Sequence, residues 1–203
     1  MDNKQRAEIL SKAFAHDGVY AENEHYLLRR VEKKDRENYL DIYRAKDMWK
    51  TLLAYPDLDA DEGLWEALWS EDVLNTIIVR KTDKHFCGFC GLQGFNRLAA
   101  PELSIEIVLD CQHQGVGTEV LPMLMNRYRD LTGTQEYISK VDPDNEPSKG
   151  LMVKIGGVPD GTAPLSSVIK ETTKKRLAGL ESVNQILSCE VLVYRFRLPA
   201  SGS

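Results

Sequence analysis

The clearest repeat of apolar and polar positions lies between residues 102 and 109 and has a period of two. One face of this segment carries the apolar set Leu103, Ile105, Ile107 and Leu109. The other face carries Glu102, Ser104, Glu106 and Val108. Such alternation is typical of a β-strand with one buried face. Apolar and β-branched runs predict the remaining strands, which span 25–31, 75–80, 86–92, 135–141 and 189–198.

Apolar residues at helical spacing predict five helices. They lie over 4–15, over Tyr39, Leu40 and Tyr43 after a cap at Asp35, and over 59–69, 115–131 and 145–155. Pro122 lies inside the fourth of these and is expected to bend it, because proline removes a backbone donor. Residues 159–187 are interpreted as a Pro/Gly loop followed by a helix. The order of elements predicts an α/β protein of the mixed α+β type, with helices on both faces of a mixed sheet.

The 203 residues are expected to form one domain, 1–203, with 1–20 as an N-terminal helical extension and 159–187 as an insertion before the last strand. Lys and Arg total 26 against 31 acidic residues, so the net charge of −5 argues against a nucleic-acid partner. No apolar run predicts a membrane-spanning helix or a signal peptide. The four cysteines are expected to be reduced thiols, and the predicted location is the cytoplasm.

The segment between strand 102–109 and the next helix carries two glycines, Gly115 and Gly117. Glycines let a ligand approach the backbone closely, and a helix N-terminus attracts anions, so the segment predicts a phosphate or pyrophosphate site. A turn that merely needs two glycines is an equal alternative. A dinucleotide-binding fingerprint is disfavoured because Val120 occupies the position of its third glycine or alanine. No Gly-Lys-Ser/Thr run is present, which excludes a P-loop.

The remaining pattern, Gln112-x-x-Gly115-x-Gly117, resembles the GCN5-related N-acetyltransferase (GNAT) family. A later strand–helix element has matching spacing at Val141, Pro143, Asn145, Ser148, Leu151, Lys154 and Gly156. The resemblance covers residues 25–198 and implies a three-layer α/β/α sandwich around a mixed, mostly antiparallel sheet. The Asn-x-x-Ser helix without a tyrosine looks most like the branch that acetylates ribosomal-protein N-termini, which also contains enzymes for small amines.

The resemblance implies acetyl-CoA as cosubstrate, with its pyrophosphate on the loop that begins at Gln112. The donors would be the backbone amides of Gln114, Gly115, Val116, Gly117 and Thr118. The pantetheine arm would pair with the backbone of Ile107, Val108 and Leu109 like an added strand. Asn145 and Ser148 would contact it from the opposite helix, although Asn145 is also a favoured helix cap. The loop lacks the basic residue that the family often carries.

Glu106 is the predicted general base for the amine, acting through water. Glu102 lies about 13 Å further from the cofactor end of the strand and is held in reserve. Alternatively, both carboxylates form ion pairs inside the sheet. Met152 occupies the position of the family's usual tyrosine acid, and a thioether cannot donate a proton. Ser148 is therefore the candidate acid for the thiolate, or simply a residue of the helix start. A backbone N–H near Val108 is expected to polarise the thioester carbonyl.

No metal site is expected. Cys87 and Cys90 form a C-x-x-C motif, but no second pair follows at zinc spacing. On a regular strand, residues three apart point to opposite faces, so the two thiols are not expected to share an ion. The four histidines show no metal-binding spacing either.

Together these features predict an N-acetyltransferase that moves an acetyl group from acetyl-CoA to a primary amine, by direct attack in a ternary complex. The acceptor is a small molecule or a protein N-terminus, and no membrane partner is expected. A homodimer is a family-level expectation. The main alternative is a non-catalytic acyl-CoA-binding sensor or interaction module on the same fold. A nicotinamide-dependent enzyme is the second alternative.

Overall fold

A computed structural model describes residues 8–9, 11–15, 17–44, 62, 65–66, 68–69, 73–94, 100–164 and 189–200. These residues form one eight-stranded sheet in the order β1-β2-β3-β4-β5-β6-β8-β7. The strands are β1 (Val19–Glu22), β2 (Tyr26–Arg30), β3 (Val73–Arg80), β4 (His85–Gln93), β5 (Glu102–Ile107), β6 (Glu136–Val141), β7 (Val158–Pro164) and β8 (Glu190–Arg197). Only β5 and β6 pair in parallel, and all other neighbours are antiparallel.

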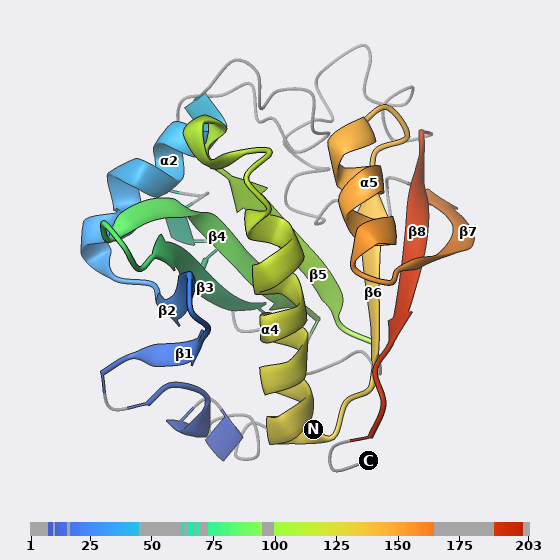
Figure 1. Cartoon of the computed structure of the whole chain (residues 1–203). Helices are drawn as coiled ribbons and strands as arrows, with labels where there is room; N and C mark the ends of the chain where they lie inside the picture. The colour runs from blue at the N-terminus through green and yellow to red at the C-terminus, as the bar shows by residue number, and fades with distance from the viewer. Residues whose placement is uncertain are drawn as a thin grey trace.

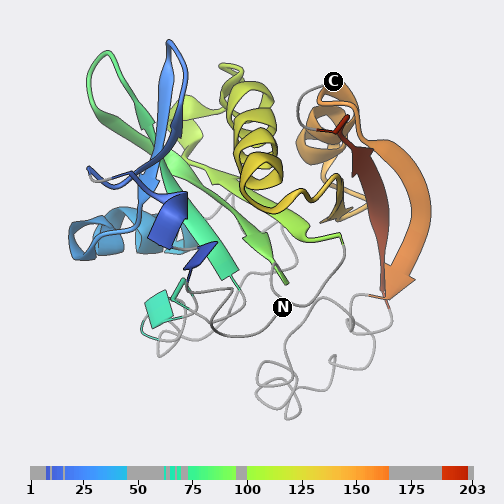
Figure 2. The ribbon, with the colours of Figure 1, turned by 90° about the horizontal axis from the view of Figure 1, so that it is seen from below.

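Helices cover both faces of this sheet (Figures 1 and 2). The described helices are α2 (Arg36–Arg44), α4 (Val116–Thr132) and α5 (Glu146–Lys154), with 3₁₀ turns η1 (Lys33–Asp35) and η3 (Leu109–Cys111). On one face, α4 contributes Leu121 and Leu124 to a large buried cluster. On the other face, α2 contributes Tyr39 and Leu40 to a second cluster. The predicted α/β sandwich with a mostly antiparallel sheet is confirmed.

Most elements lie where periodicity placed them. The strands expected over 25–31, 75–80, 86–92, 135–141 and 189–198 are β2, β3, β4, β6 and β8, and the helices over 115–131 and 145–155 are α4 and α5. Helix α4 continues through Pro122. Strand β5 is shorter than expected, because the chain turns into η3 after Ile107 and leaves Leu109 half exposed.

Two strands were not predicted. Strand β1 has only four residues, too few to show a period. Strand β7 replaces the Pro/Gly loop expected from residue 159 onward. It is the last strand of the sheet, and a register shift between Pro159 and Thr162 accommodates Gly161. An edge strand tolerates prolines, because one side of its backbone needs no ladder partner.

Three expected helices lie partly or wholly outside the described residues. Residues 8–9 and 11–13 of the N-terminal helix are helical, and Ala13 is fully buried in the α4-side cluster. In the segment 59–69, Glu62, Trp65 and Glu66 are helical. The helix expected after residue 164 lies outside the described residues. No helix among the described residues is long and apolar enough to cross a membrane.

A β-bulge in β4 overturns the expectation for the C-x-x-C motif. The β3–β4 register shifts between Ile78 and Val79, so β4 carries one extra residue at Cys87. An extra residue changes which side chains share a face. Cys87 and Cys90 therefore both lie in the α4-side cluster, where both are fully buried. At Gly88, with φ +136°, a Cβ atom would lie 2.0 Å from the carbonyl oxygen of Glu106, so a side chain does not fit there.

Candidate active site

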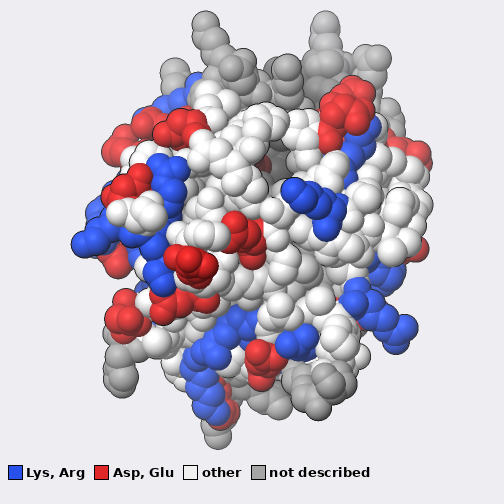
Figure 3. Space-filling model, viewed as in Figure 1, with Lys and Arg blue, Asp and Glu red and all other residues white. Residues whose placement is uncertain are grey.

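Strands β5 and β6 touch at one end and separate toward the other (Figure 1). Their ladder consists of the single pair Glu102–Ile138, supported by the Ile138 N–H donating to the Pro101 carbonyl at 3.1 Å. No other residue of these two fully described strands pairs across the gap. The space-filling surface is hollowed between the N-terminal part of α4 and α5 (Figure 3). The sheet therefore opens toward the end of β5 from which the glycine-containing loop departs.

That loop delivers the chain into α4 through left-handed backbone conformations. His113 has φ 60°, and Gly115, with φ 83°, is the residue before the helix. No side chain caps this helix end. The first N–H groups of a helix have no partner inside it, and the helix dipole is positive there. The Gln112 side chain holds the loop to β5 by donating to the Ile107 carbonyl at 2.9 Å. Such a geometry suits an anion, so the predicted phosphate site stays a prediction.

Two of the predicted loop residues also have structural partners. The backbone N–H of Thr118 donates to the Gly115 carbonyl at 3.0 Å, and its hydroxyl donates to the same oxygen at 2.6 Å. A Cβ atom at Gly117 would lie 2.7 Å from Cδ2 of Leu151. Gly117 therefore allows α4 to approach α5 closely, which is a packing role in addition to any role toward a ligand.

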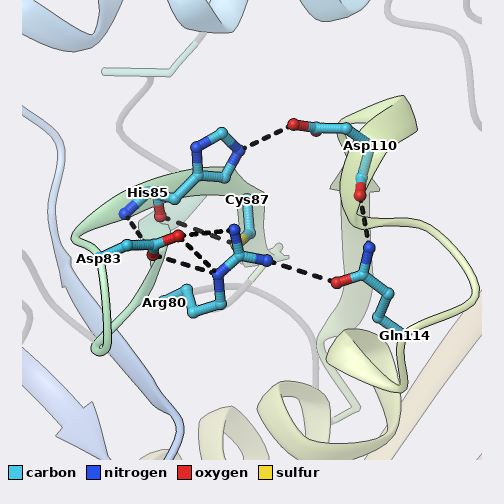
Figure 4. Close-up of polar contacts among 6 residues, drawn as sticks. All are labelled: Arg80, Asp83, His85, Cys87, Asp110 and Gln114. Carbon is cyan, nitrogen blue, oxygen red and sulfur yellow. Dashed lines mark hydrogen bonds and ion pairs between the residues drawn. The ribbon is translucent and has the colours of Figure 1, made fainter.

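Arg80 brings a positive charge to the loop, a feature that the sequence analysis missed. The guanidinium of Arg80, at the end of β3, donates to Oε1 of Gln114 at 3.3 Å (Figure 4). It also donates to Asp83 at 2.8 Å, which lowers the pKa of that carboxyl to about 2. Gln114 in turn donates to the carbonyl of Asp110. The antiparallel pairing of β3, β4 and β5 brings residues 80 and 114 together. No spacing in the sequence predicts this contact.

The two carboxylates of β5 have different surroundings. Glu102 forms an ion pair with Lys140 at 3.0 Å, and both side chains are largely buried. Burial raises the pKa of Glu102, although Lys140 partly offsets this effect. Glu106 has no ion pair or hydrogen-bond partner among the described side chains, and burial raises its pKa to about 7. The internal ion pair considered for both residues therefore holds for Glu102, whereas Glu106 has none within the described ranges.

Glu106 faces the α2 side of the sheet. It lies directly across from Phe89 of β4, and paired residues of adjacent strands project to the same side. The rings of Tyr39 and Phe89 are 4.9 Å apart, and those of Tyr43 and Phe89 are 6.4 Å apart. The carboxyl group thus borders an aromatic cluster, and this apolar neighbourhood is the physical cause of its raised pKa.

The helix on the other side of the gap begins at Asn145. The side-chain oxygen of Asn145 accepts a hydrogen bond from the Ser148 N–H at 3.1 Å, so the helix-cap role considered for Asn145 is present. Ser148 is half-buried, and its hydroxyl has no hydrogen bond to the described part of the chain. Met152 is 2% exposed and belongs to the α4-side cluster. The position that the family usually gives to tyrosine therefore serves the hydrophobic core here.

The N–H of Val108 itself has a structural partner. It donates to the carbonyl of Cys87 at 3.0 Å, which extends the β4–β5 pairing by one residue beyond the strand. A donor already directed at a backbone carbonyl is not aimed at a thioester. The oxyanion donor expected near Val108 is therefore sought among the neighbouring N–H groups, and the expectation stays a prediction.

An opened sheet beside an uncapped helix start is a geometry that suits a long ligand with an anionic end. Residues 25–158 match the acetyltransferase (GNAT) domain, and the chain belongs to this family of acyltransferases. No protein of curated function matches the sequence.

Solved structures with this fold share little sequence with the chain. One, provisionally named a ribosomal-protein-serine acetyltransferase, from Vibrio cholerae, has 14% identity and a TM-score of 0.67, over 88% of this chain and 97% of its own. The microcin C7 self-immunity acetyltransferase MccE, solved with acetyl-CoA and AMP, has 18% identity and a TM-score of 0.64, over 92% and 99%. Spermidine N-acetyltransferase from V. cholerae, solved with CoA and spermine, has 15% identity and a TM-score of 0.64, over 86% and 96%.

Proposed function

We propose that the protein transfers an acetyl group from acetyl-CoA to a primary amine by direct attack within a ternary complex. One observation carries the proposal: β5 and β6 part toward the end where the uncapped α4 begins. A gap between strands accepts an extended pantetheine arm, and the helix start accepts a pyrophosphate. Within the family, these two features belong to one ligand.

In this proposal the pyrophosphate lies on the amides from Gln114 to Gly117, and Arg80 supplies the charge that the loop lacks. The Thr118 amide, also expected as a donor, is left out because it already donates to the Gly115 carbonyl. The pantetheine arm runs along residues 107–109, opposite Asn145. The Asn145 side-chain oxygen already accepts from Ser148, so its NH₂ group is the part free to contact the arm. The protein is expected to act as a single cytoplasmic domain, with its four cysteines as reduced thiols.

Glu106 is the general base. A lysine-like amine costs about 4.6 kcal/mol to deprotonate at pH 7, and an α-amine about 1 kcal/mol. A carboxylate whose pKa is about 7 is a much better proton acceptor at that pH than an ordinary one. The amine nitrogen forms a bond to the acetyl carbon as the carbon–sulfur bond breaks. The amine proton passes to Glu106 through water, and the CoA thiolate takes a proton from the Ser148 hydroxyl or from solvent.

The acceptor is a small amine or a protein N-terminus. Relatives of similar structure were solved with spermine or carry a ribosomal-protein name, so both classes occur on this fold. The aromatic cluster beside Glu106 favours an amine with an apolar or cationic body. The second candidate function, a sensor that binds acyl-CoA without turnover, is favoured by Met152, which removes the usual acid.

Calorimetric titration with acetyl-CoA, CoA and NADH tests the proposal. Gly117→Val is a poor loop variant, because its side chain would strike Leu151. Gln114→Glu is better, because it adds a negative charge at an exposed position beside the anion site. Asn126→Asp adds the same charge at an exposed position further along α4 and serves as the control.

We expect acetyl-CoA and CoA to bind, Gln114→Glu to weaken both at least tenfold, and Asn126→Asp to leave them unchanged. NADH should not bind. Turnover is then followed by thiol release with a panel of amines. Absence of acetyl-CoA binding would overturn the proposal. Tight binding without release of thiol from any amine or N-terminal peptide would favour the sensor.

A further inference from the structure

Three potential metal ligands converge beside the loop, on residues to which the acetyl transfer gives no role. His85 begins β4, and Asp110 and Cys111 belong to η3. One ligand atom from each lies within 4.8 Å of the other two. The Nε2 atom of His85 is 3.1 Å from a carboxylate oxygen of Asp110, and Figure 4 shows the ring turned toward that carboxylate.

The contacts of these side chains differ, and the Cys111 thiol has a hydrogen-bond contact with the Cys87 thiol. The Nε2 atom of His85 is buried and makes no directed hydrogen bond among the described residues, so its approach to Asp110 is an ion-pair contact only. A buried ring nitrogen without a hydrogen bond is costly unless something binds it. The thiol of Cys111 is buried at the same place, while Asp110 is exposed. The cluster therefore combines one nitrogen, one oxygen and one sulfur ligand, reachable from solvent through Asp110.

We propose that His85, Asp110 and Cys111 bind a divalent ion of the zinc type, with water as fourth ligand. Nitrogen, sulfur and carboxylate oxygen together suit Zn²⁺ and its substitute Co²⁺ better than Mg²⁺ or Ca²⁺, which prefer oxygen alone. The imidazole binds neutral, and one carboxylate and one thiolate balance the two positive charges. On binding, the Cys111 S–H bond breaks, a sulfur–metal bond forms, and the proton leaves to solvent.

The surroundings are compatible with such an ion. His85 and Asp110 line a cavity of about 690 Å³, which gives the ion a path from solvent. The guanidinium of Arg80 forms an ion pair with Asp83 and contacts Gln114 of the loop, so its positive charge is partly balanced. Lys84 also lines this cavity, and it forms no ion pair with the described residues.

The sequence predicted no metal site because the ligands come from two segments at unusual spacing. The bulge and the turn of η3 bring them together. If the proposed function holds, the ion would also steady the cofactor loop, since Leu109 and Asp110 carbonyls accept hydrogen bonds from Gln112 and Gln114. The metal would then act on acetyl-CoA affinity without touching the reacting atoms.

Cobalt titration of the chelator-treated full chain, without any CoA compound, tests the site directly. We expect one equivalent of Co²⁺ to produce the near-ultraviolet charge-transfer band of a cobalt–thiolate bond, and Zn²⁺ to displace it. Cys111→Ser should abolish the band. His85→Asn and Asp110→Asn should weaken binding at least tenfold. Cys189→Ser and His113→Asn, which change an exposed thiol and a histidine outside the cluster, should leave the titration unchanged.

Absence of the band, or a band that survives Cys111→Ser or disappears with Cys189→Ser, overturns the proposal. Asp110 is exposed, so Asp110→Asn should fold even if Cys111→Ser does not. Unchanged Co²⁺ affinity in Asp110→Asn would likewise overturn the three-ligand site. Acetyl-CoA affinity is measured separately with and without Zn²⁺. A protein that binds acetyl-CoA but no metal would refute the metal site and leave the proposed function standing.

Discussion

The two ends of strand β5 differ in how they are held. At its beginning, β5 pairs with β6, and Glu102 is neutralised by Lys140. At its end β5 has no pairing with β6, and the half-buried Glu106 has no cation beside it among the described residues. The same residue type on the same face of one strand is structural at the closed end and available for chemistry at the open end. The difference comes from the neighbouring strand and not from the local sequence.

The largest expected effect is on turnover at the open end. Glu106→Gln removes the base but keeps the shape of the side chain, so kcat should fall by about 10² to 10⁴. Acetyl-CoA affinity should stay within about twofold, as measured by calorimetry. Glu102→Gln is the matched control on the same strand and should keep most of the activity. Equal losses in both variants would contradict the division between the two ends.

At the closed end the main effect is on stability. Lys140→Met leaves the carboxylate of Glu102 buried without its partner, which should lower the free energy of unfolding by about 3 kcal/mol. Chemical denaturation checks this value. The double variant Glu102→Gln with Lys140→Met should recover most of the loss, because no charge is then buried. If Lys140→Met is as stable as the parent protein, the pair does not hold the strands together.

The pH dependence of turnover sharpens the assignment of Glu106. Its pKa is raised to about 7 by burial, so the basic, ionised form disappears as the pH falls through 7. With a saturating amine, kcat should rise roughly tenfold from pH 6 to pH 8 and then level off. The Glu106→Gln variant should lack this rise. A profile that still bends near pH 7 in the variant would assign the ionisation to another group.

The smallest effect is expected across the gap, at Ser148. CoA thiolate is a tolerable leaving group, so Ser148→Ala should lower kcat less than tenfold. The backbone N–H of residue 148 still donates to Asn145 in this variant, so the helix cap is kept. Thiol release at saturating acetyl-CoA gives the comparison. A loss as large as that of Glu106→Gln would make the hydroxyl a required acid.

Local patterns in the sequence were sufficient for elements whose side chains repeat regularly. The alternation that predicted β5 also placed Glu102 and Glu106 on one face, and the two glycines marked the turn before α4. The pattern failed at β7, where prolines and glycine hid an edge strand. It also failed at Cys87, because a bulge depends on how β4 fits its neighbours.

Contacts between segments that lie far apart in the sequence could not be predicted from it. Nothing in the sequence shows that Arg80 contacts Gln114. Nor does it show that Lys140 forms its ion pair with Glu102 and not with Glu106. These contacts separate a structural carboxylate from a reactive one. The sequence could therefore name the candidates for the base, but choosing between them needed the neighbours of each.

The close contact between Gly117 and Leu151 has a consequence for how the site meets its ligand. The start of α4 packs directly against α5, the helix that carries Ser148 and is capped by Asn145. The glycine-containing loop and α5 are therefore held in a fixed arrangement. Ordering of this surface then occurs when the chain folds and not when a ligand arrives, and binding loses less conformational entropy. A cavity-forming change at Leu151 would loosen both walls at once, and affinity would fall although no atom that meets the ligand had changed.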